Sequence, residues 1–246
     1  MTLFLRAVLG VSLLGLVACD DGASSPPPEQ PEVTIRGGLD RATFTYDCAA
    51  PSDPQCNVDA DLAPIRKEKS PFPQIALGSR FKLSTVSIDY PVLRVAPVST
   101  DFLEPQGEGV VLAKRRGASG VLAQQLDGTA IDFANLEIVA PAKYEILQAT
   151  PQGDFRGANV NLGGGSVSAQ ASVVYTFKFR VVARGEDDNI LAGALPCQWT
   201  SSNEQVAKIE GDATSNVVTV KSASAGNSDI TVTFGDFTGV VRIEVK

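Results

Sequence analysis

The chain has 246 residues, of which 43% are hydrophobic, and its formal net charge at pH 7 is −7. It contains no histidine, which excludes Ser-His-Asp and Cys-His nucleophile pairs, imidazole acid–base catalysis and His-ligated metal centres. The excess of acidic side chains argues against a nucleic-acid partner, because neutralising phosphates requires clustered Lys and Arg.

Residues 1–18 have the pattern of an export signal. A short basic start precedes an apolar run over Ala7–Val17, which is shorter than the roughly 20 residues that a membrane-spanning helix needs. The run ends in Leu16-Val17-Ala18-Cys19, which resembles the lipobox of bacterial lipoproteins. That resemblance implies cleavage before Cys19 and acylation (palmitate or a similar chain) of its sulfur, so the membrane partner would be reached through lipid. The alternative is an ordinary secretory signal.

Residues 19–43 are predicted to be the lipidated cysteine and a disordered tether. The stretch Asp20–Glu32 (DDGASSPPPEQPE) has no apolar residue larger than alanine, and in polyproline geometry, at about 3.1 Å per residue, it would reach about 40 Å. We therefore expect a folded part held away from the bilayer in the cell envelope. The pattern leaves open the periplasmic side of the outer membrane, the cell surface and the inner membrane.

Residues 44–73 form a predicted lead segment that contains a disulfide. Cys48 and Cys56 enclose a proline-containing loop, and an exported protein meets an oxidising compartment, so these two cysteines are the expected pair. Cys197 is then left over. It lies two residues before Trp199, on the same face of a strand, which predicts an inert buried thiol.

One calcium candidate follows Cys56. Asn57, Asp59 and Asp61 alternate, and Glu68 falls at the twelfth position counted from Asn57, as in an EF-hand loop. The sixth position is Leu62, where that loop needs glycine, so a solvated acidic loop is the competing interpretation.

A second calcium candidate is the acidic cluster Glu186, Asp187 and Asp188, between two predicted strands. Its competing interpretation is a polar hairpin tip that keeps the protein soluble. No other cofactor is expected.

From residue 74 onward the chain has the pattern of an all-β protein. Over Val173–Val181 the apolar residues Tyr175, Phe177, Phe179 and Val181 alternate with polar ones, which is typical of a half-buried strand in an antiparallel sheet. Val121–Leu126 has the length of a strand or of a short helix. Shorter alternations occur at Phe81–Leu83, Leu136–Ile138, Ile230–Phe234 and Val241–Val245.

The strands divide into two related halves, residues 74–150 and 151–246. Gly117 and Gly226 each precede a predicted strand, which is followed by a turn and a final strand. Units of this size suit β-sandwiches of about seven strands.

The second half resembles a known family. Its motifs are Trp199-Thr200-Ser201-Ser202-Asn203, Val206-Ala207-Lys208-Ile209, Val218-Thr219-Val220 and Ala225-Gly226. In this order, over Ser166–Val245, they resemble a bacterial immunoglobulin-like domain of group 2. Glu210–Asn216 departs from the family's tight turn, and the first half resembles the family only in outline, as a degenerate copy. The resemblance implies tandem immunoglobulin-like sandwiches, common on envelope proteins, and no enzymatic activity.

Two further motifs have simpler explanations. Lys114-Arg115-Arg116 is the only basic run; it could bind a phosphate or acidic glycan, but an exposed polar turn is favoured. Ser79-Arg80-Phe81-Lys82 has the Ser-x-x-Lys spacing of penicillin-binding enzymes, which requires a helix. Here Phe81 and Leu83 alternate as in a strand, so Ser79 and Lys82 would face opposite sides.

The expected function is therefore that of a non-catalytic structural or protein-interaction module. Among enzymes, only a carboxylate pair of the glycosidase type survives the absence of histidine. The partner would be an envelope protein or a polysaccharide. The alternative is a carbohydrate-binding or adhesive surface module, for which Tyr46, Tyr90 and Tyr144 would supply the aromatic surface because Trp199 is a core position.

Overall fold

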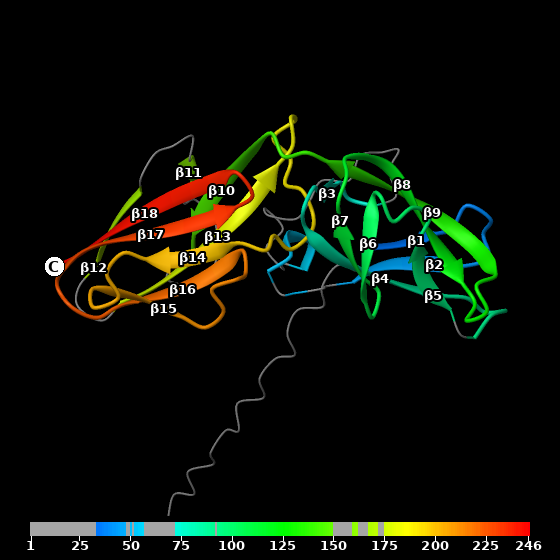
Figure 1. The fold of residues 1–246 in the computed structure, drawn as a ribbon, viewed down its shortest axis with the longest axis horizontal. Helices are drawn as coiled ribbons and strands as arrows, with labels where there is room; N and C mark the ends of the chain where they lie inside the picture. The colour runs from blue at the N-terminus through cyan, green and yellow to red at the C-terminus, as the bar shows by residue number, and fades with distance from the viewer. Residues whose placement is uncertain are drawn as a thin grey trace, which may run out of the picture.

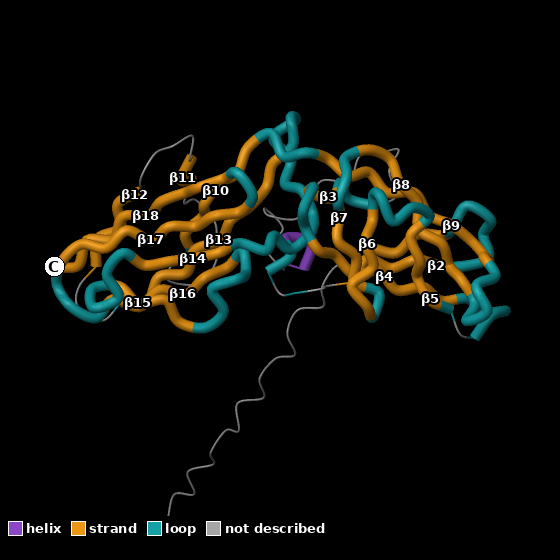
Figure 2. Tube along the Cα trace, in the orientation of Figure 1, coloured by secondary structure: helices purple, strands orange, loops and turns teal. Residues whose placement is uncertain are grey.

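The computed structural model describes residues 33–47, 50, 52–56, 72–91, 93–149, 159–161, 167–171 and 175–246. These residues form two β-sandwiches placed end to end, with the C-terminus at the far end of the second (Figure 1). In the described part, the one helical segment is a single 3-10 turn, η1 (Pro54–Cys56), at the seam between the sandwiches (Figure 2). No helix in these ranges is long and apolar enough to cross a bilayer.

The first sandwich consists of a five-stranded and a four-stranded sheet. The strand orders are β1-β2-β4-β7-β6 and β3-β9-β8-β5. All neighbours are antiparallel except β3, which runs parallel to β9. The strands are β1 (Val33–Arg36), β2 (Thr43–Asp47), β3 (Ile75–Ala76), β4 (Arg80–Val86), β5 (Arg94–Pro97), β6 (Leu103–Gly107), β7 (Val110–Ala113), β8 (Gly117–Gln124) and β9 (Ala130–Val139).

The second sandwich repeats this arrangement. Its sheets have the orders β11-β10-β13-β16-β15 and β12-β18-β17-β14, and β12 runs parallel to β18. The strands are β10 (Lys143–Gln148), β11 (Asn159–Asn161), β12 (Val167–Ala171), β13 (Thr176–Arg184), β14 (Gln198–Ser201), β15 (Ala207–Glu210), β16 (Val217–Ser222), β17 (Gly226–Phe234) and β18 (Phe237–Val245).

Both sandwiches have the strand order of an immunoglobulin fold. In that fold, strands A, B, E and D form one sheet, and C, F and G form the other. Here β2-β4-β7-β6 and β10-β13-β16-β15 are the A-B-E-D sheets. The expectation of an all-β chain with tandem immunoglobulin-like sandwiches is confirmed. The first half has the full set of strands, which its degenerate sequence did not indicate.

The boundaries differ from those expected from the sequence. β1 and β2 fall in residues 19–43 and 44–73, the predicted tether and lead segment, yet they are paired strands of the first sheet. β10 precedes residue 151 but pairs with β13 of the second sandwich. The reason is that these strands are short, and pairing with distant segments, which no local pattern reveals, decides which sheet they join.

The alternating residues form the two cores as expected. Phe177, Phe179 and Val181 are buried in the second sandwich, while Tyr175 is 36% exposed and lies before the strand. Arg180 is one of the polar residues that alternate with these apolar ones in the sequence, yet it is also buried. It lies at the seam, where the charge of Asp53 reaches it. Val121–Leu126 is mainly strand β8 and not a helix.

The residues around Trp199 make structural contacts at one end of the second sandwich. Trp199 is buried in the core, and its indole Nε1 donates a hydrogen bond to the carbonyl of Ser215 at 2.7 Å. Ser201 Oγ donates to the carbonyl of Ala207 at 2.6 Å and lies 3.0 Å from Ser228 Oγ. These bonds join β14, β15 and β17 at one end of the sandwich, so the serines of the motif have a structural role.

Candidate functional site

Several residues singled out from the sequence lie outside the described residues. They are Cys19, Cys48, Asn57, Asp59, Asp61 and Glu68. The lipid anchor, the Cys48–Cys56 pairing and the first calcium loop therefore stay predictions. Cys56 itself is buried, and its sulfur is not a free thiol.

The acidic cluster after β13 is not gathered around a cation site. Asp188 lies 2.7 Å from the ammonium of Lys143, and its carbonyl accepts a hydrogen bond from Arg184 Nη1 at 2.7 Å. The hydrogen bond from Lys143 keeps the pKa of Asp188 below its ordinary value. Within the described ranges, no group of three or more acidic or cysteine side chains could hold a metal ion. The arrangement of Asp188 matches the polar hairpin tip.

Cys197 is a buried free thiol, as predicted. Burial raises its pKa to about 12. Because the thiolate is the reactive form of cysteine, this side chain is inert in the folded protein.

The contacts of the basic run and of the Ser-x-x-Lys motif agree with the simpler interpretation of each, a polar turn and a strand without catalytic role. Lys114 pairs with Glu104 at 2.9 Å, and the Arg115 guanidinium lies 5.2 Å from the centre of the Phe102 ring. Ser79 is fully buried, and its hydroxyl donates to the carbonyl of Ala76 at 2.7 Å. It therefore cannot act as a nucleophile on an external substrate.

Of the three tyrosines proposed for glycan stacking, Tyr46 belongs to the first sandwich and Tyr144 to the second, while Tyr90 is half-buried on the β4–β5 loop. Tyr46 is buried and donates a hydrogen bond from its hydroxyl to Asp53 Oδ2 at 2.8 Å. Tyr144 packs in the second sandwich against Phe237 and Phe234, with ring centroids 4.8 and 5.7 Å away. Trp199 is also buried, so these four rings do not gather into one exposed platform for sugar rings.

One functional feature that the sequence did not indicate is the seam between the sandwiches. The connection from β13 to β14 enters the first sandwich between β3 and β4. Ala76 N donates to the carbonyl of Ala192 at 2.9 Å, and Arg80 and Ala194 exchange two backbone hydrogen bonds of 2.9 and 2.7 Å. Ala192 is part of the first core, whereas Ala76 is part of the second. The two cores therefore interlock.

Gly193 makes this close approach possible. Its φ is +103°, a left-handed value that favours glycine, and a Cβ there would collide with the side chain of Ser79. Its backbone N–H donates to Asp53 Oδ1 at 3.0 Å.

Asp53 joins three parts of the seam. Besides Gly193 of the second sandwich, its carboxylate accepts hydrogen bonds from Tyr46 of β2 and from the backbone of Gln55. Burial raises the pKa of Asp53 to about 6, although these bonds and the charge of Arg180 lower it. Nothing in the local sequence around Asp53 signals this role.

Asn216 adds a further link at the seam. Its side-chain Nδ2 donates to the carbonyl of Ser52 and to that of Val181, both at 3.0 Å. Asn216 ends the stretch Glu210–Asn216 that departs from the family pattern. This stretch brings the polar side chain of Asn216 into contact with Ser52 at the seam.

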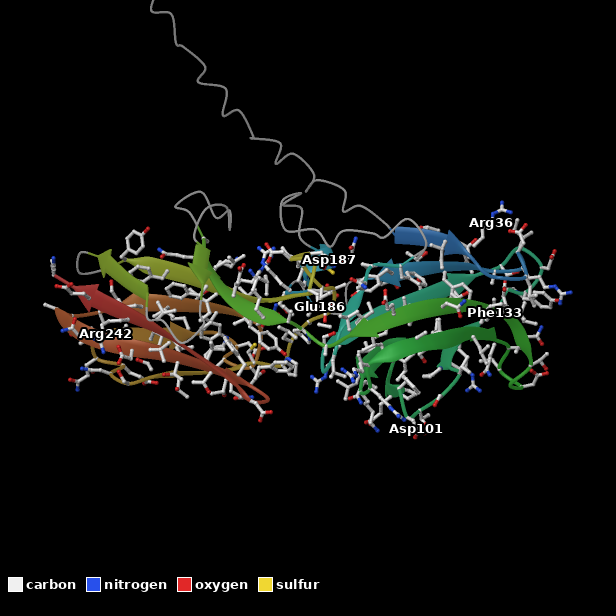
Figure 3. The ribbon with its side chains drawn as sticks, turned by 90° about the horizontal axis from the view of Figure 1, so that it is seen from above. Arg36, Asp101, Phe133, Glu186, Asp187 and Arg242 are labelled. Atoms are coloured by element: carbon white, nitrogen blue, oxygen red, sulfur yellow. The ribbon has the colours of Figure 1, made fainter. Side chains whose placement is uncertain are left out.

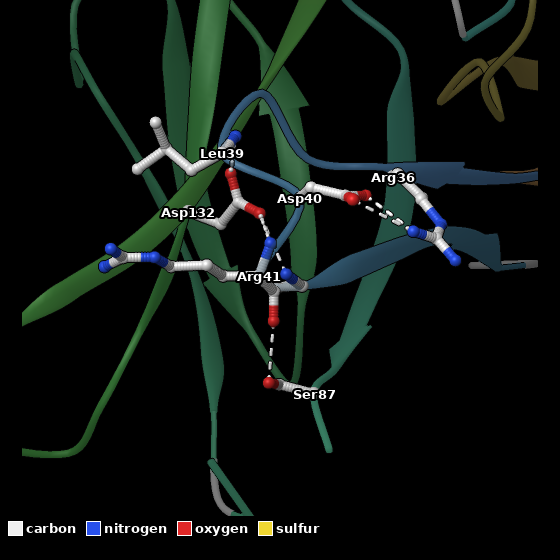
Figure 4. A network of polar contacts seen from close by, with 7 residues as sticks. Arg36, Leu39, Asp40, Arg41, Ser87 and Asp132 are labelled. Carbon is white, nitrogen blue, oxygen red and sulfur yellow. Dashed lines mark hydrogen bonds and ion pairs between the residues drawn. The ribbon is translucent and has the colours of Figure 1, made fainter. Parts of the chain in front are cut away.

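The opposite end of the first sandwich is an organised loop surface. We call it the distal end: the β1–β2 turn (residues 37–42), the β4–β5 loop (residues 87–91) and the β8–β9 turn (residues 125–129). Asp132 of β9 holds the first of these, accepting hydrogen bonds of 2.8 Å from the backbone N–H groups of Leu39, Arg41 and Ala42 (Figure 4). Ser87 Oγ donates to the carbonyl of Arg41 at 2.7 Å and joins the second loop to the first.

The sequence contains a signal for Asp132. It lies in phase with Ala134, Leu136 and Ile138, the inward residues of β9, so it is a carboxylate at a core position. Burial opposes its ionisation, but four backbone N–H groups hold the pKa of Asp132 below its ordinary value. A buried, charged acceptor of this kind fixes the turn above it.

Exposed apolar side chains collect at the distal end. Six of the seven large hydrophobic side chains that the described residues expose belong to the first sandwich. Ile88 is fully exposed on the β4–β5 loop. A cavity of about 360 Å³ lies between this loop and the β1–β2 turn. Figure 3 shows Arg36 and Phe133 near this end and Glu186 and Asp187 near the seam. The other exposed residues of the distal end and its neighbouring strands are Leu39, Val86, Leu126 and Phe133.

The comparisons with known proteins identify no family. No family model and no curated protein matches the sequence. Domains 4 and 5 of the S-layer protein SbsC match over 74% of this chain and 98% of theirs, at 13% identity and a TM-score of 0.31. The bacterial integrin-binding protein invasin matches over 68% of this chain and 36% of its own, at 15% identity and a TM-score of 0.29. The immunoglobulin-like assignment rests on the strand order of this chain's own sheets.

Proposed function

We propose that this protein is a lipid-anchored, non-catalytic interaction module of the cell envelope, and that its distal end binds a protein partner. The observation that carries the proposal is the collection of exposed apolar side chains at that end. Single exposed apolar residues are ordinary on a protein surface, but the gathering of five of the seven exposed ones of the described residues at one end and its neighbouring strands is typical of an interaction surface.

The geometry of the loops supports the same function. Asp132 and Ser87 hold the β1–β2 turn and the β4–β5 loop in one arrangement before any partner arrives. Binding loops that are already ordered lose less conformational entropy on association. The interlocked seam holds the second sandwich behind this end, as a support that presents it.

Photo-crosslinking in intact cells tests the binding surface. A photoreactive amino acid at position 88 replaces the fully exposed Ile88, and the same residue at exposed Lys208 of the second sandwich is the matched control. We expect one defined protein adduct from position 88, lost when Leu39→Asp is added, and no such adduct from position 208. Equal adducts from both positions, or none from position 88, would contradict the proposal.

The proposed anchor has its own test. Lipidation of Cys19 predicts that cells fed an alkyne-labelled fatty acid incorporate the label into the wild-type protein and not into Cys19→Ser. The variant should also move from the membrane fraction to the soluble fraction, because the acyl chains supply the membrane affinity. Retention of label in Cys19→Ser would exclude this cysteine as the acylated residue.

A further inference from the structure

The connection between β13 and β14 contains a segment that pairs with the first sandwich. This donated segment, residues 190–195, belongs by sequence to the second sandwich and lies between the two (Figure 1). Ala192 forms a parallel bridge with Ile75 of β3, and Ala194 forms an antiparallel bridge with Arg80 of β4. Because β3 and β4 lie in different sheets, the donated segment joins both sheets of the first sandwich.

The backbone bonds of the donated segment are those of a strand. Ala192 donates its N–H to the carbonyl of Gln74 at 2.8 Å, and its carbonyl accepts the N–H of Ala76 at 2.9 Å. A residue bonded to both neighbours of the residue opposite it is the pattern of parallel strands. On the other side, Ala194 and Arg80 exchange both of their backbone bonds, as an antiparallel pair does.

The side chains of the donated segment are divided between the two cores. Leu191 and Leu195 are buried in the second core, whereas Ala192 between them is buried in the first. The exchange is reciprocal, because Ala76 of β3 is buried in the second core. Moving the donated segment away would therefore expose apolar surface of both cores to water, which is unfavourable.

Buried polar side chains fix the donated segment in place. Asn189, directly before it, donates a hydrogen bond from Nδ2 to Gln74 Oε1 at 3.0 Å, and both side chains are buried. Gly193 donates its N–H to the buried carboxylate of Asp53 at 3.0 Å. Since a buried polar group that loses its partner is costly, these bonds add to the cost of separating the sandwiches.

We propose that residues 190–195 are a strand which the second sandwich donates to the first, and that the first sandwich is stable only while this strand is in place. Domains of one chain ordinarily have a core of their own and can fold alone. Here the two sandwiches unfold together, in one step. The distal end, which the first sandwich carries, then exists only in a chain whose second sandwich is folded.

Native-state hydrogen exchange of the full chain tests this coupling. The slowest amides of a strand report the free energy of the opening that exposes them. We expect the slowest amides of β9, in the first sandwich, and of β17, in the second, to have equal protection and to lose it together as denaturant is added. Protection that differs between the two strands by more than about tenfold would overturn the inference.

Two core substitutions show whether each sandwich senses the other. Leu83→Ala leaves a cavity in the first core and Ile230→Ala leaves one in the second, and both side chains are buried. Either substitution should lower the protection of both β9 and β17 by about tenfold or more. A loss confined to the sandwich that carries the substitution would show that the two fold independently.

Gly193→Ala tests the donated segment itself, and Gly211→Ala is its matched control. Both glycines have a left-handed φ, +103° and +82°, so the two substitutions strain the backbone in a similar way. A Cβ at Gly193 would collide with Ser79 of the first sandwich, whereas a Cβ at Gly211 would meet open space.

We expect Gly193→Ala to lower the protection of β9 by about tenfold more than Gly211→Ala does. Equal effects of the two variants on β9 would overturn the role of the donated segment. If Gly193→Ala does not fold, the wild-type exchange and the two core variants decide. The crosslink at Ile88 bears only on the distal end, so its loss leaves this inference unchanged.

Discussion

At the scale of single residues, the carboxylate of Asp53 is the group most sensitive to its surroundings. It is fully buried, hydrogen-bonded from both sandwiches, and burial raises its pKa from 3.8 to about 6. A carboxyl group whose pKa is higher in the folded state than in the unfolded state binds its proton more tightly when folded. Its contribution to stability is therefore fully present below about pH 4 and is lost as the pH rises through 6.

The direction of this pH dependence gives a prediction for Asp53→Asn. The amide keeps the shape and the hydrogen-bonding capacity of the side chain but has no charge to bury. Between pH 4 and 7 the free energy of unfolding of the wild type should fall relative to the variant, by on the order of 3 kcal/mol for a shift of this size.

Thermal unfolding at each pH measures the difference between the two proteins. Subtracting the profile of the variant from that of the wild type removes the pH dependence that comes from other carboxylates. One of these is Asp132, whose lowered pKa gives stability that is lost as the pH falls. Parallel profiles for the two proteins would show that Asp53 does not titrate in this window.

At the scale of elements, the β1–β2 turn depends on a side chain from a distant strand. Asp132 accepts hydrogen bonds from three backbone N–H groups of this turn. Removing this buried acceptor leaves the three donors without a partner. We expect Asp132→Ala to lower the free energy of unfolding by about 1–3 kcal/mol and to speed amide exchange at Leu39, Arg41 and Ala42.

The matched control is Asp127, whose exposed carboxylate accepts hydrogen bonds from Thr129 within the β8–β9 turn and from no distant strand. Asp127→Ala should change stability by no more than about 0.5 kcal/mol, as for an ordinary surface substitution. Denaturant unfolding compares the two variants. If Asp132→Ala were no less stable than Asp127→Ala, the turn would not depend on this carboxylate.

At the scale of the whole molecule, the seam makes two sandwiches behave as one body. Backbone bonds join Ala76 to Ala192 and Arg80 to Ala194, and each core includes a residue of the other half. Interfaces between domains of one chain are mobile unless they are extensive and apolar, so these contacts are needed for a fixed arrangement.

Asn216→Ala tests this rigidity. It leaves the buried carbonyls of Ser52 and Val181 without their donor, which costs about 1–3 kcal/mol. In ¹⁵N relaxation, the two sandwiches of the wild type should share one rotational correlation time. The two sandwiches of the variant should have different, shorter correlation times. Independent tumbling of the wild-type sandwiches would refute a rigid seam.

The sequence by itself determined the all-β class, the strands with long alternating patterns and the residues that those strands bury. Period-two alternation placed Phe177 and Phe179 inside, and the same reasoning buried Cys197 and Trp199. It succeeded because the alternation of a strand is a local property, which any segment with one buried face must show.

The tertiary structure alone decided where the sandwiches begin, how they interlock and which polar groups hold them. Asp53 and Asn216 lie in loops whose local sequence is compatible with solvent, yet both are buried at the seam. Their partners are up to 164 positions away in the chain. Short polar side chains gain their roles from the loops that meet around them, and the packing of distant strands decides which loops those are.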